Sequence, residues 1–187
     1  MAINSNPKDR ILETASRLFY AQGYNATGIN QILEEAKVAK ASLYTHYGSK
    51  DDLGIAYIKA AREEWFKALN TFLEKKTSPQ DKIVSCFDFL EHNLRLNNFR
   101  GCRFINLLAE VSEQNIIMRN EIVEHKTKLR QFFKSLVKEC GTSNSNQTAD
   151  AFFLLFEGAV VEAKIHLDVW AVKSAKKTVQ FLLVNSV

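Results

Sequence analysis

The sequence predicts an all-α fold, and three features carry this prediction. Apolar residues recur at three- and four-residue spacing through most of the chain, as they do in amphipathic helices. The 187 residues include only two prolines, and none follows Pro79, so long helices can run uninterrupted through the second half. The hydrophobic and charged fractions, 46% and 25%, are typical of a globular protein. We therefore expect about nine helices, with enough length for one large core or two small ones.

The first three helices are expected to be short and to form one compact unit. The first covers residues 9–22 and ends where Gly23 can cap it. Thr27 opens a second helix, a tight break follows at Lys37, and a third helix covers about residues 39–45.

The later helices are expected to be longer. Ser49 precedes an acidic first turn, as the helix dipole prefers, and caps a helix that runs to about residue 75. Pro79 stands where the next helix begins. An apolar segment at 104–111 follows, and then helices at about 115–140, 148–168 and 171–185. The polar stretch 142–148 is interpreted as a loop.

The composition argues against several classes of protein. The longest apolar run, residues 151–156, is far shorter than the roughly 20 residues of a membrane span, so no membrane partner is expected. The first residues lack the apolar core and cleavage site of an export signal, and we expect a cytoplasmic protein. Three cysteines, Cys86, Cys102 and Cys140, lack the spacing of a disulfide framework or zinc site and are interpreted as buried thiols.

Net charge does not decide whether the chain binds nucleic acid. The formal charge is +4 and the pI is about 8.9, yet the first 53 residues hold six basic and six acidic side chains. A basic surface would therefore have to come from the arrangement of these groups in space.

The segment from Thr27 to Leu53 resembles the signature of the TetR/AcrR family of transcriptional regulators. In that signature a threonine opens the second helix, and an Ala-Gly-Val-Ser-type turn leads to a recognition helix ending in Leu-Tyr-x-His-Phe. Ser-Lys-x-x-Leu then opens the fourth helix. This chain has Leu-Tyr-Thr-His-Tyr at 43–47 and Ser-Lys-Asp-Asp-Leu at 49–53, and it shares a Phe-Glu-Gly-Ala segment at 156–159. The resemblance implies a helix-turn-helix DNA-binding domain, residues 1–48, and a helical ligand-binding and dimerisation domain, residues 49–187.

The resemblance also implies which residues contact DNA. Thr27 and Lys50, each at a helix N-terminus, would bind phosphates beside the groove. Side chains on or just past the third helix would reach phosphates or base edges in the major groove, namely Lys40, Ser42, Tyr44, Thr45 and His46. Leu43 would anchor that helix, and Tyr47 would join the small core.

Three residues depart from the family pattern. Lys37 stands where glycine is most common in the turn, and a left-handed conformation there would cost about 1–2 kcal/mol. Ala39 replaces the usual Ser or Thr cap, a loss of roughly 0.5–2 kcal/mol. Ala41 replaces a common glycine. These departures predict a less stable turn and not a different fold.

Eight of the thirteen phenylalanines lie in the four central helices, namely Phe87, Phe89, Phe104, Phe132, Phe133, Phe152, Phe153 and Phe156. They are interpreted either as a packed core or, following the resemblance, as the lining of a cavity for a largely apolar small-molecule effector. The residues implied for such a cavity are Phe87, His92, Arg103, Phe104, Asn106, Phe133, Phe156 and Glu157.

The last two helices are expected to form a four-helix interface in a homodimer, as they do in the family. An internal core face is the alternative for the same residues. The small residues that would allow close helix approach are Gly158, Ala159 and Ala163. The apolar stripe at spacings of 3, 4 and 3 residues comprises Val172, Ala175, Val179 and Leu182.

Catalytic and metal-binding patterns are not found in the sequence, so we expect no enzyme, no metal and no cofactor. The acid–histidine pairs at i,i+4, which are Asp88 with His92, Glu121 with His125, and Glu162 with His166, are single pairs on separate helices. The expected function is a dimeric, ligand-responsive repressor that binds a near-palindromic operator in double-stranded DNA. The alternatives are a DNA-binding regulator without an effector, and a helical enzyme or carrier built on the aromatic cavity.

Overall fold

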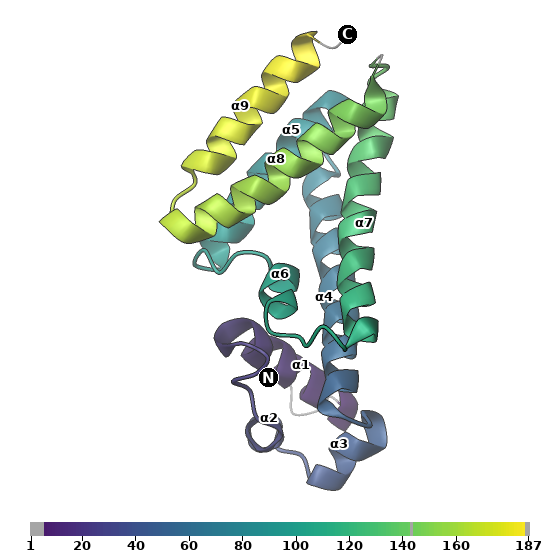
Figure 1. Ribbon diagram of the computed structural model, residues 1–187, viewed down its shortest axis with the longest axis vertical. Coiled ribbons are helices and arrows are strands. Elements are labelled where there is room, and N and C mark those ends of the chain that lie inside the picture. Colours follow the sequence, from purple (N-terminus) through teal and green to yellow (C-terminus); the bar gives the residue numbers. More distant parts are fainter. Residues whose placement is uncertain (1–5, 143, 186–187) are drawn as a thin grey trace. The chain divides into compact units, whose positions relative to one another are not determined.

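The computed structural model describes residues 6–142 and 144–185, and within them every regular element is an α-helix (Figure 1). In chain order the helices of this described part are α1 (Pro7–Gln22), α2 (Ile29–Ala36), α3 (Lys40–His46), α4 (Lys50–Leu73), α5 (Pro79–Leu96), α6 (Arg103–Leu108), α7 (Ile116–Glu139), α8 (Ser145–His166) and α9 (Trp170–Asn185). The predicted all-α fold is confirmed. Over the same residues, no helix has both the length and the apolar content to cross a membrane.

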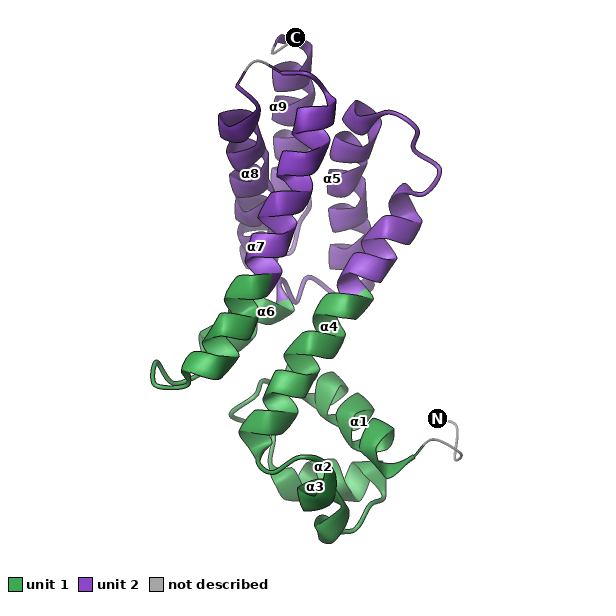
Figure 2. Ribbon diagram, turned by 90° about the vertical axis from the view of Figure 1, so that its right-hand side faces the viewer, with its two compact units in different colours: residues 1–64, 103–124 green, residues 65–102, 125–187 purple. Residues whose placement is uncertain are grey.

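The chain packs into two compact units (Figure 2). Unit 1 combines the described residues up to Glu64 with Arg103–Glu124, and unit 2 combines Trp65–Cys102 with the described residues from His125 onward. Helices α4 and α7 each contribute residues to both units. Unit 1 contains more than the predicted DNA-binding domain of residues 1–48, and a functional boundary at residue 48 stays a prediction.

Capping residues explain where α1 begins and ends. The Asn6 side chain accepts a hydrogen bond from the backbone N–H of Asp9 at 2.9 Å, and Pro7 occupies the first turn, where its missing N–H does no harm. The helix therefore starts at Pro7, two residues before the predicted start. Gly23 ends the helix with a φ of 100°, a conformation that glycine adopts without a Cβ clash.

The turn between α2 and α3 has the predicted left-handed residue. Lys37 has φ 54° and ψ 51°, and its backbone N–H donates to the Glu34 carbonyl. Ala39, at the N-cap of α3, provides no side-chain hydrogen bond. Both departures from the family pattern are therefore visible in the backbone, and each removes a small stabilising contribution.

A small apolar core holds the first helices of unit 1 together. Leu43 is completely buried, which confirms it as the anchor of α3. Tyr47 is also buried, as predicted, and its hydroxyl donates to the Lys8 carbonyl at 3.2 Å. The other buried apolar residues of these helices include Ile11, Ala15, Leu18, Phe19, Ile32, Leu53 and Tyr57.

Thr27 does not open α2, which begins at Ile29 with Gly28 at the N-cap. The Thr27 side chain is 0% exposed, and its hydroxyl donates to the Gly23 carbonyl at 2.6 Å. The prediction that this side chain binds a phosphate is corrected, because the hydroxyl is enclosed in the connection between α1 and α2.

Serine caps the starts of α4 and α5. The Ser49 hydroxyl oxygen accepts from the backbone N–H of Asp52 at 3.0 Å, and the Ser78 hydroxyl does the same for Asp81 at 3.0 Å. The predicted Ser49 cap is confirmed, and the Ser78 cap was not predicted. Helix α4 ends at Leu73, two residues before the expected end.

Aromatic side chains fill the core of unit 2. Phe87 and Phe133 are completely buried, and both rings contact Phe156 at centroid distances of 5.7 Å. Such edge-to-face contacts contribute about 0.5–1.5 kcal/mol beyond the burial of area. The packed-core interpretation therefore describes these phenylalanines.

Helix α8 begins at Ser145, so the predicted loop 142–148 is too long. Its first turn is polar, and the unpaired N–H groups of a first helical turn tolerate polar side chains well. Residue 143 lies outside the described residues. The helix ends at His166, before Leu167 with a φ of 51°, and the Asp168 carboxylate accepts from the backbone N–H of Trp170.

The stripe predicted to form the dimer interface is buried inside the single chain. Helix α9 packs against α8 and α5, which cover this face. The 3–4 spacing indicates a buried face, but the neighbour that buries it belongs to the same chain. The assignment to a subunit interface is therefore corrected for Ala159, Ala163, Val172, Ala175 and Val179, each at most 7% exposed. Gly158 stays exposed, and Leu182 is partly buried.

The three cysteines do not share one environment. Cys86 is buried, as expected, whereas Cys102 and Cys140 are partly exposed. The interpretation as buried thiols therefore holds only for Cys86.

Candidate nucleic-acid interface

Helix α3 presents polar and aromatic side chains to solvent around its buried anchor. Leu43 faces the core, and Tyr44 is 51% exposed. Lys40, Thr45 and His46 are exposed, and Ser42 is half-buried. The structure therefore brings five of the seven predicted DNA-contact residues together on one short helix.

These side chains offer the groups that read a DNA groove. Lys40 supplies a positive charge for phosphate, and Tyr44 and His46 supply hydrogen-bond donors and acceptors for base edges. The Thr45 hydroxyl donates to the Ala41 carbonyl at 2.9 Å. Its oxygen keeps a lone pair, and its methyl group is suited to a thymine methyl.

Lys50, the sixth predicted contact, is held at the start of α4. Its Nζ lies 4.5 Å from the ring centroid of Tyr24, a cation–π contact. Partial burial lowers the pKa of Lys50, and the charges of Asp51 and Glu110 oppose that shift. The Lys50 amine therefore lies over the Tyr24 ring, and both residues belong to unit 1.

Hydrogen bonds to Asp51 hold the Tyr24 side chain in place. The Tyr24 hydroxyl donates to one Asp51 oxygen at 2.5 Å, and the Asn115 amide donates to the other at 2.8 Å. Burial, together with the hydrogen bond and charge of Asp51, raises the pKa of Tyr24, so its hydroxyl stays a donor at neutral pH. Both oxygens of the Asp51 carboxylate are therefore occupied.

The segment from α6 to α7 is part of the same unit. The Glu110 carboxylate accepts from the backbone N–H of Asn25 at 2.7 Å, and the Asn25 amide donates to the Glu110 carbonyl at 3.0 Å. Arg103 pairs with Glu64 at 2.9 Å and lies over the ring of Tyr20. These contacts tie residues far apart in sequence to α1 and α4.

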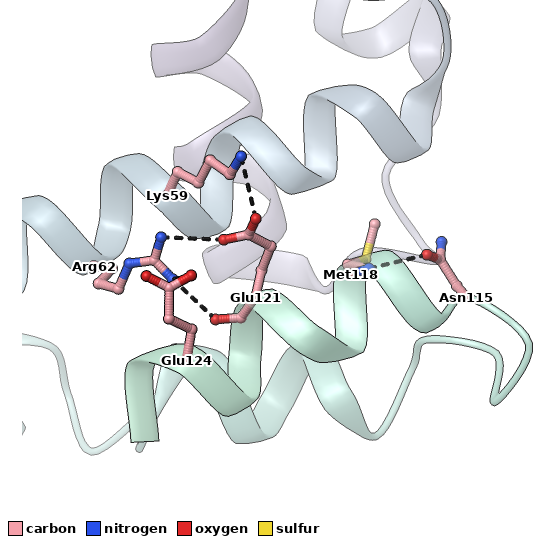
Figure 3. Close-up of polar contacts among 6 residues, drawn as sticks. All are labelled: Lys59, Arg62, Asn115, Met118, Glu121 and Glu124. Carbon is pink, nitrogen blue, oxygen red and sulfur yellow. Dashed lines mark hydrogen bonds and ion pairs between the residues drawn. The ribbon is translucent and has the colours of Figure 1, made fainter. Parts of the chain in front are cut away.

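An ionic cluster centred on the buried Arg62 joins α4 to α7 (Figure 3). Arg62 is 8% exposed, and its guanidinium donates to the Glu121 carboxylate and to the Glu121 carbonyl, each at 3.1 Å. Lys59 reaches the other Glu121 oxygen at 3.1 Å, and Glu124 pairs with Arg62 at 3.2 Å. A buried guanidinium needs this degree of pairing to offset its lost hydration.

The helices also approach closely near that cluster. A Cβ atom at Gly54 would lie 2.6 Å from the Met118 Cε atom, so a side chain there would force Met118 to move. The sequence alone did not predict these contacts of α4 with the α7 region, because the paired residues are 59 or more positions apart and no local pattern pairs them.

The predicted effector residues do not form one group. Arg103, Phe104 and Asn106 belong to unit 1, whereas the other five belong to unit 2. Within unit 2, His92 is exposed and Glu157 pairs with Lys126. The set therefore remains a prediction.

Unit 2 contains a pocket that the sequence did not indicate. Its volume is about 310 Å³, at the lower end of the range for small-molecule sites. None of the predicted effector residues lines it. Its lining residues are Asn70, Leu73, Glu74, Lys82, Phe132, Ser135, Leu136 and Glu139.

The acid–histidine pairs have ordinary partners. His166 and Glu162 are 3.3 Å apart on the surface of α8. Asp88 pairs with Lys176 at 2.5 Å. His125 is buried, and its ring lies 5.3 Å from that of Trp65.

Known proteins share this fold and this helix-turn-helix. Residues 11–57 match the family model for bacterial regulatory proteins of the tetR family. The chain is 26% identical over 158 residues to the HTH-type transcriptional regulator LmrA of Bacillus subtilis, covering 82% of this chain and 84% of LmrA. It is 22% identical over 173 residues to the HTH-type transcriptional repressor NemR of Escherichia coli, covering 84% of each. A crystal structure of a TetR-family transcriptional regulator from Streptomyces coelicolor has a TM-score of 0.87 and 25% identity, covering 96% of this chain and 95% of that one.

The helix-turn-helix and the all-α fold define a DNA-binding regulator of transcription. Residues 11–57 match the tetR family, and the fold of the whole chain is that of the TetR-family regulator from Streptomyces coelicolor. TetR-family regulators bind DNA as dimers, and the relatives described above are regulators and not enzymes.

Proposed function

We propose that this chain is a homodimeric repressor that binds a near-palindromic operator and is released by a small-molecule effector. The exposed face of α3 carries this proposal, because Lys40, Tyr44 and His46 surround a buried anchor and are free of the core. Two such helices, about one DNA turn or 34–36 Å apart, would read two half-sites. The choice of repression over activation is supported by the relative NemR, whose name describes a repressor.

The proposed DNA contacts have two roles: some position the protein on the duplex, and others read the base sequence. Lys40 and Lys50 would bind phosphates, which fix the register and carry no sequence information. Ser42, Tyr44, Thr45 and His46 would read base edges. Thr27 is left out of this set because its hydroxyl is enclosed.

The dimer would use the solvent-facing side of α8 and α9. Leu154, Val161 and Ile165 are 66%, 46% and 64% exposed and lie at helical spacing with Gly158, which falls between Leu154 and Val161. No atom lies within 4 Å of a Cβ built at Gly158, so a partner helix could approach closely there. On α9, Phe181 is 67% exposed. An exposed apolar face of this kind is typical of an interaction site.

The effector would act on unit 2, whose pocket has both apolar and charged lining residues. Helices α4 and α7 belong to both units, so chain continuity provides a route for coupling. An effector must bind the two conformations with different affinity to shift them. The complete burial of Phe87 and Phe133 favours the alternative of a regulator without an effector at the predicted residues.

Salt-dependent binding to duplex DNA tests the core of this proposal. Each phosphate contact should add about 0.9 to the slope of log K against log salt. Lys40→Ala should lower the slope by about one unit, whereas Lys138→Ala, an exposed lysine of α7 in unit 2, serves as the matched control. A flat salt dependence, or equal effects of the two variants, would contradict the proposal.

A further inference from the structure

The connection between α6 and α7 binds two segments of unit 1 that are distant in the sequence. Its first contact is with the loop after α1. The Glu110 carboxylate accepts from the backbone N–H of Asn25 at 2.7 Å, and the Glu110 carbonyl accepts from the Asn25 amide at 3.0 Å. A Cβ atom at Gly23 would lie 2.8 Å from the same carboxylate. The loop after α1 therefore packs tightly against this connection.

Asn115, the last residue of the connection, makes the second contact. Its side-chain oxygen accepts from the backbone N–H of Met118 at 3.1 Å and so caps the start of α7 (Figure 3). Its side-chain nitrogen donates to an Asp51 carboxylate oxygen at 2.8 Å. One side chain therefore caps α7 and also binds the first turn of α4.

The Asp51 carboxylate links Asn115 to the residues around Lys50. Its other oxygen accepts from the Tyr24 hydroxyl at 2.5 Å, and the Lys50 Nζ atom lies 4.5 Å from the centroid of the Tyr24 ring. These four residues all belong to unit 1. A continuous chain of contacts thus runs from the start of α7 to the amine that is proposed to bind a DNA phosphate.

The charges around Lys50 make the orientation of Asp51 important. Partial burial opposes the charge of Lys50 and lowers its pKa, while the charges of Asp51 and Glu110 favour the ammonium form. Hydrogen bonds from Tyr24 and Asn115 hold the Asp51 carboxylate in one orientation. Without the Asn115 donor, one Asp51 oxygen would need another partner, and Lys50 is a cation that this carboxylate already attracts.

We propose that Asn115 is a positioning residue for DNA binding, because its bond to Asp51 keeps that carboxylate from capturing the Lys50 amine. The inference rests on the proposed function, in which Lys50 binds a phosphate. A ring face attracts an ammonium group without a fixed acceptor, so the N–H groups over Tyr24 can turn toward a phosphate. A close pair with Asp51 would direct them to a carboxylate and offset the charge that attracts the phosphate.

A purely structural role is the alternative, since the Asn115 side chain also caps α7. The two roles use different atoms, the oxygen for the cap and the nitrogen for Asp51. Serine is about as good an N-cap as asparagine, and its hydroxyl lies one bond closer to the main chain than the amide nitrogen does. Asn115→Ser should therefore keep the cap and lose the bond to Asp51.

Binding of the full chain to a duplex of random sequence tests the inference, because a phosphate contact does not depend on sequence. Asn115→Ser should weaken binding about three- to tenfold at low salt and lower the slope of log K against log salt by about one unit, as Lys50→Ala does. Asn120→Ala alters an exposed asparagine of α7 in the same unit and is the matched control, which should bind like the wild type.

The double variant separates positioning from a general loss of structure. In a chain that already carries Lys50→Ala, Asn115→Ser should cause no further loss of affinity, because the contact that Asn115 supports is gone. Additive losses in the double variant, or a wild-type salt slope for Asn115→Ser, would overturn the proposal.

Nuclear magnetic resonance titration of the Lys50 side chain tests the same arrangement without DNA. The pKa of Lys50 should rise in Asn115→Ser, because a paired carboxylate favours the ammonium form, and Asp51→Asn in the same chain should abolish that rise. An unchanged pKa, or a rise that persists with Asp51→Asn, would overturn the proposal. If the wild type does not bind DNA, the proposed function fails, while the titration still decides whether Asn115 controls the partner of Lys50.

Discussion

Replacing Phe181 by alanine should weaken the dimer and leave each subunit folded. Phe181 is 67% exposed in the single chain. Complete burial of a phenylalanine side chain contributes about 1.5–3 kcal/mol, so covering the exposed two thirds contributes about 1–2 kcal/mol. A two-fold interface buries the ring twice. The variant should therefore lose about 2–4 kcal/mol of dimerisation free energy, roughly 30–700-fold in Kd.

Sedimentation equilibrium over a concentration series measures this Kd, and urea unfolding measures the stability of the same samples. Val179→Ala is the control, because Val179 is 0% exposed and packs inside the chain. That change should lower the free energy of unfolding by about 1.6 kcal/mol or more, from two lost carbons and a cavity. A Phe181→Ala dimer with the wild-type Kd would place the interface elsewhere. A loss of unfolding free energy like that of Val179→Ala would mean that the ring belongs to the core.

Three further changes test individual contacts. Lys37→Gly should stabilise the protein by about 1 kcal/mol in urea unfolding, because glycine adopts the left-handed backbone conformation of residue 37 without a Cβ clash. A loss of stability would mean that the lysine side chain makes a compensating contact. Lys50→Ala should weaken binding to operator and random DNA alike and lower the salt slope by about one unit, and an unchanged slope would remove Lys50 from the contact set. Arg62→Met removes one of the two cations that pair with Glu121 among the described residues and leaves Lys59. The change should cost about 3 kcal/mol of unfolding free energy, part of which Glu121→Gln in the same chain should restore. A wild-type unfolding curve for Arg62→Met would show that the ionic cluster does not stabilise the fold.

Local chemistry explains why much of the fold was predictable. The Ser49 cap, the Gly23 stop and the left-handed Lys37 depend on residues within about four positions, so the sequence alone contains the required information. Thr27 shows the limit of such reasoning. Its type and position are suited to a helix start, yet the hydroxyl turns inward to the Gly23 carbonyl. A one-residue shift in where a helix begins decides whether a side chain meets solvent.

Long-range packing explains what was not predictable. The spacing of Val172, Ala175 and Val179 indicates a buried face, but periodicity does not say whether the same chain or a partner covers it. The burial of this stripe by α5 and α8 depends on the whole of unit 2. Similarly, Arg62 and Glu121 are 59 residues apart, and each alone resembles an ordinary surface charge.

Selection of bound sequences from a random duplex pool tests the central claim most directly. The purified wild-type chain should enrich a near-palindromic site whose half-sites lie about one helical turn apart, 10–10.5 base pairs. Tyr44→Ala should relax the preference within each half-site, whereas Lys50→Ala should enrich the same sequence with lower affinity. Enrichment of no sequence by the wild type, or of the same sharp site by Tyr44→Ala, would contradict the assignment of α3 as the reading helix.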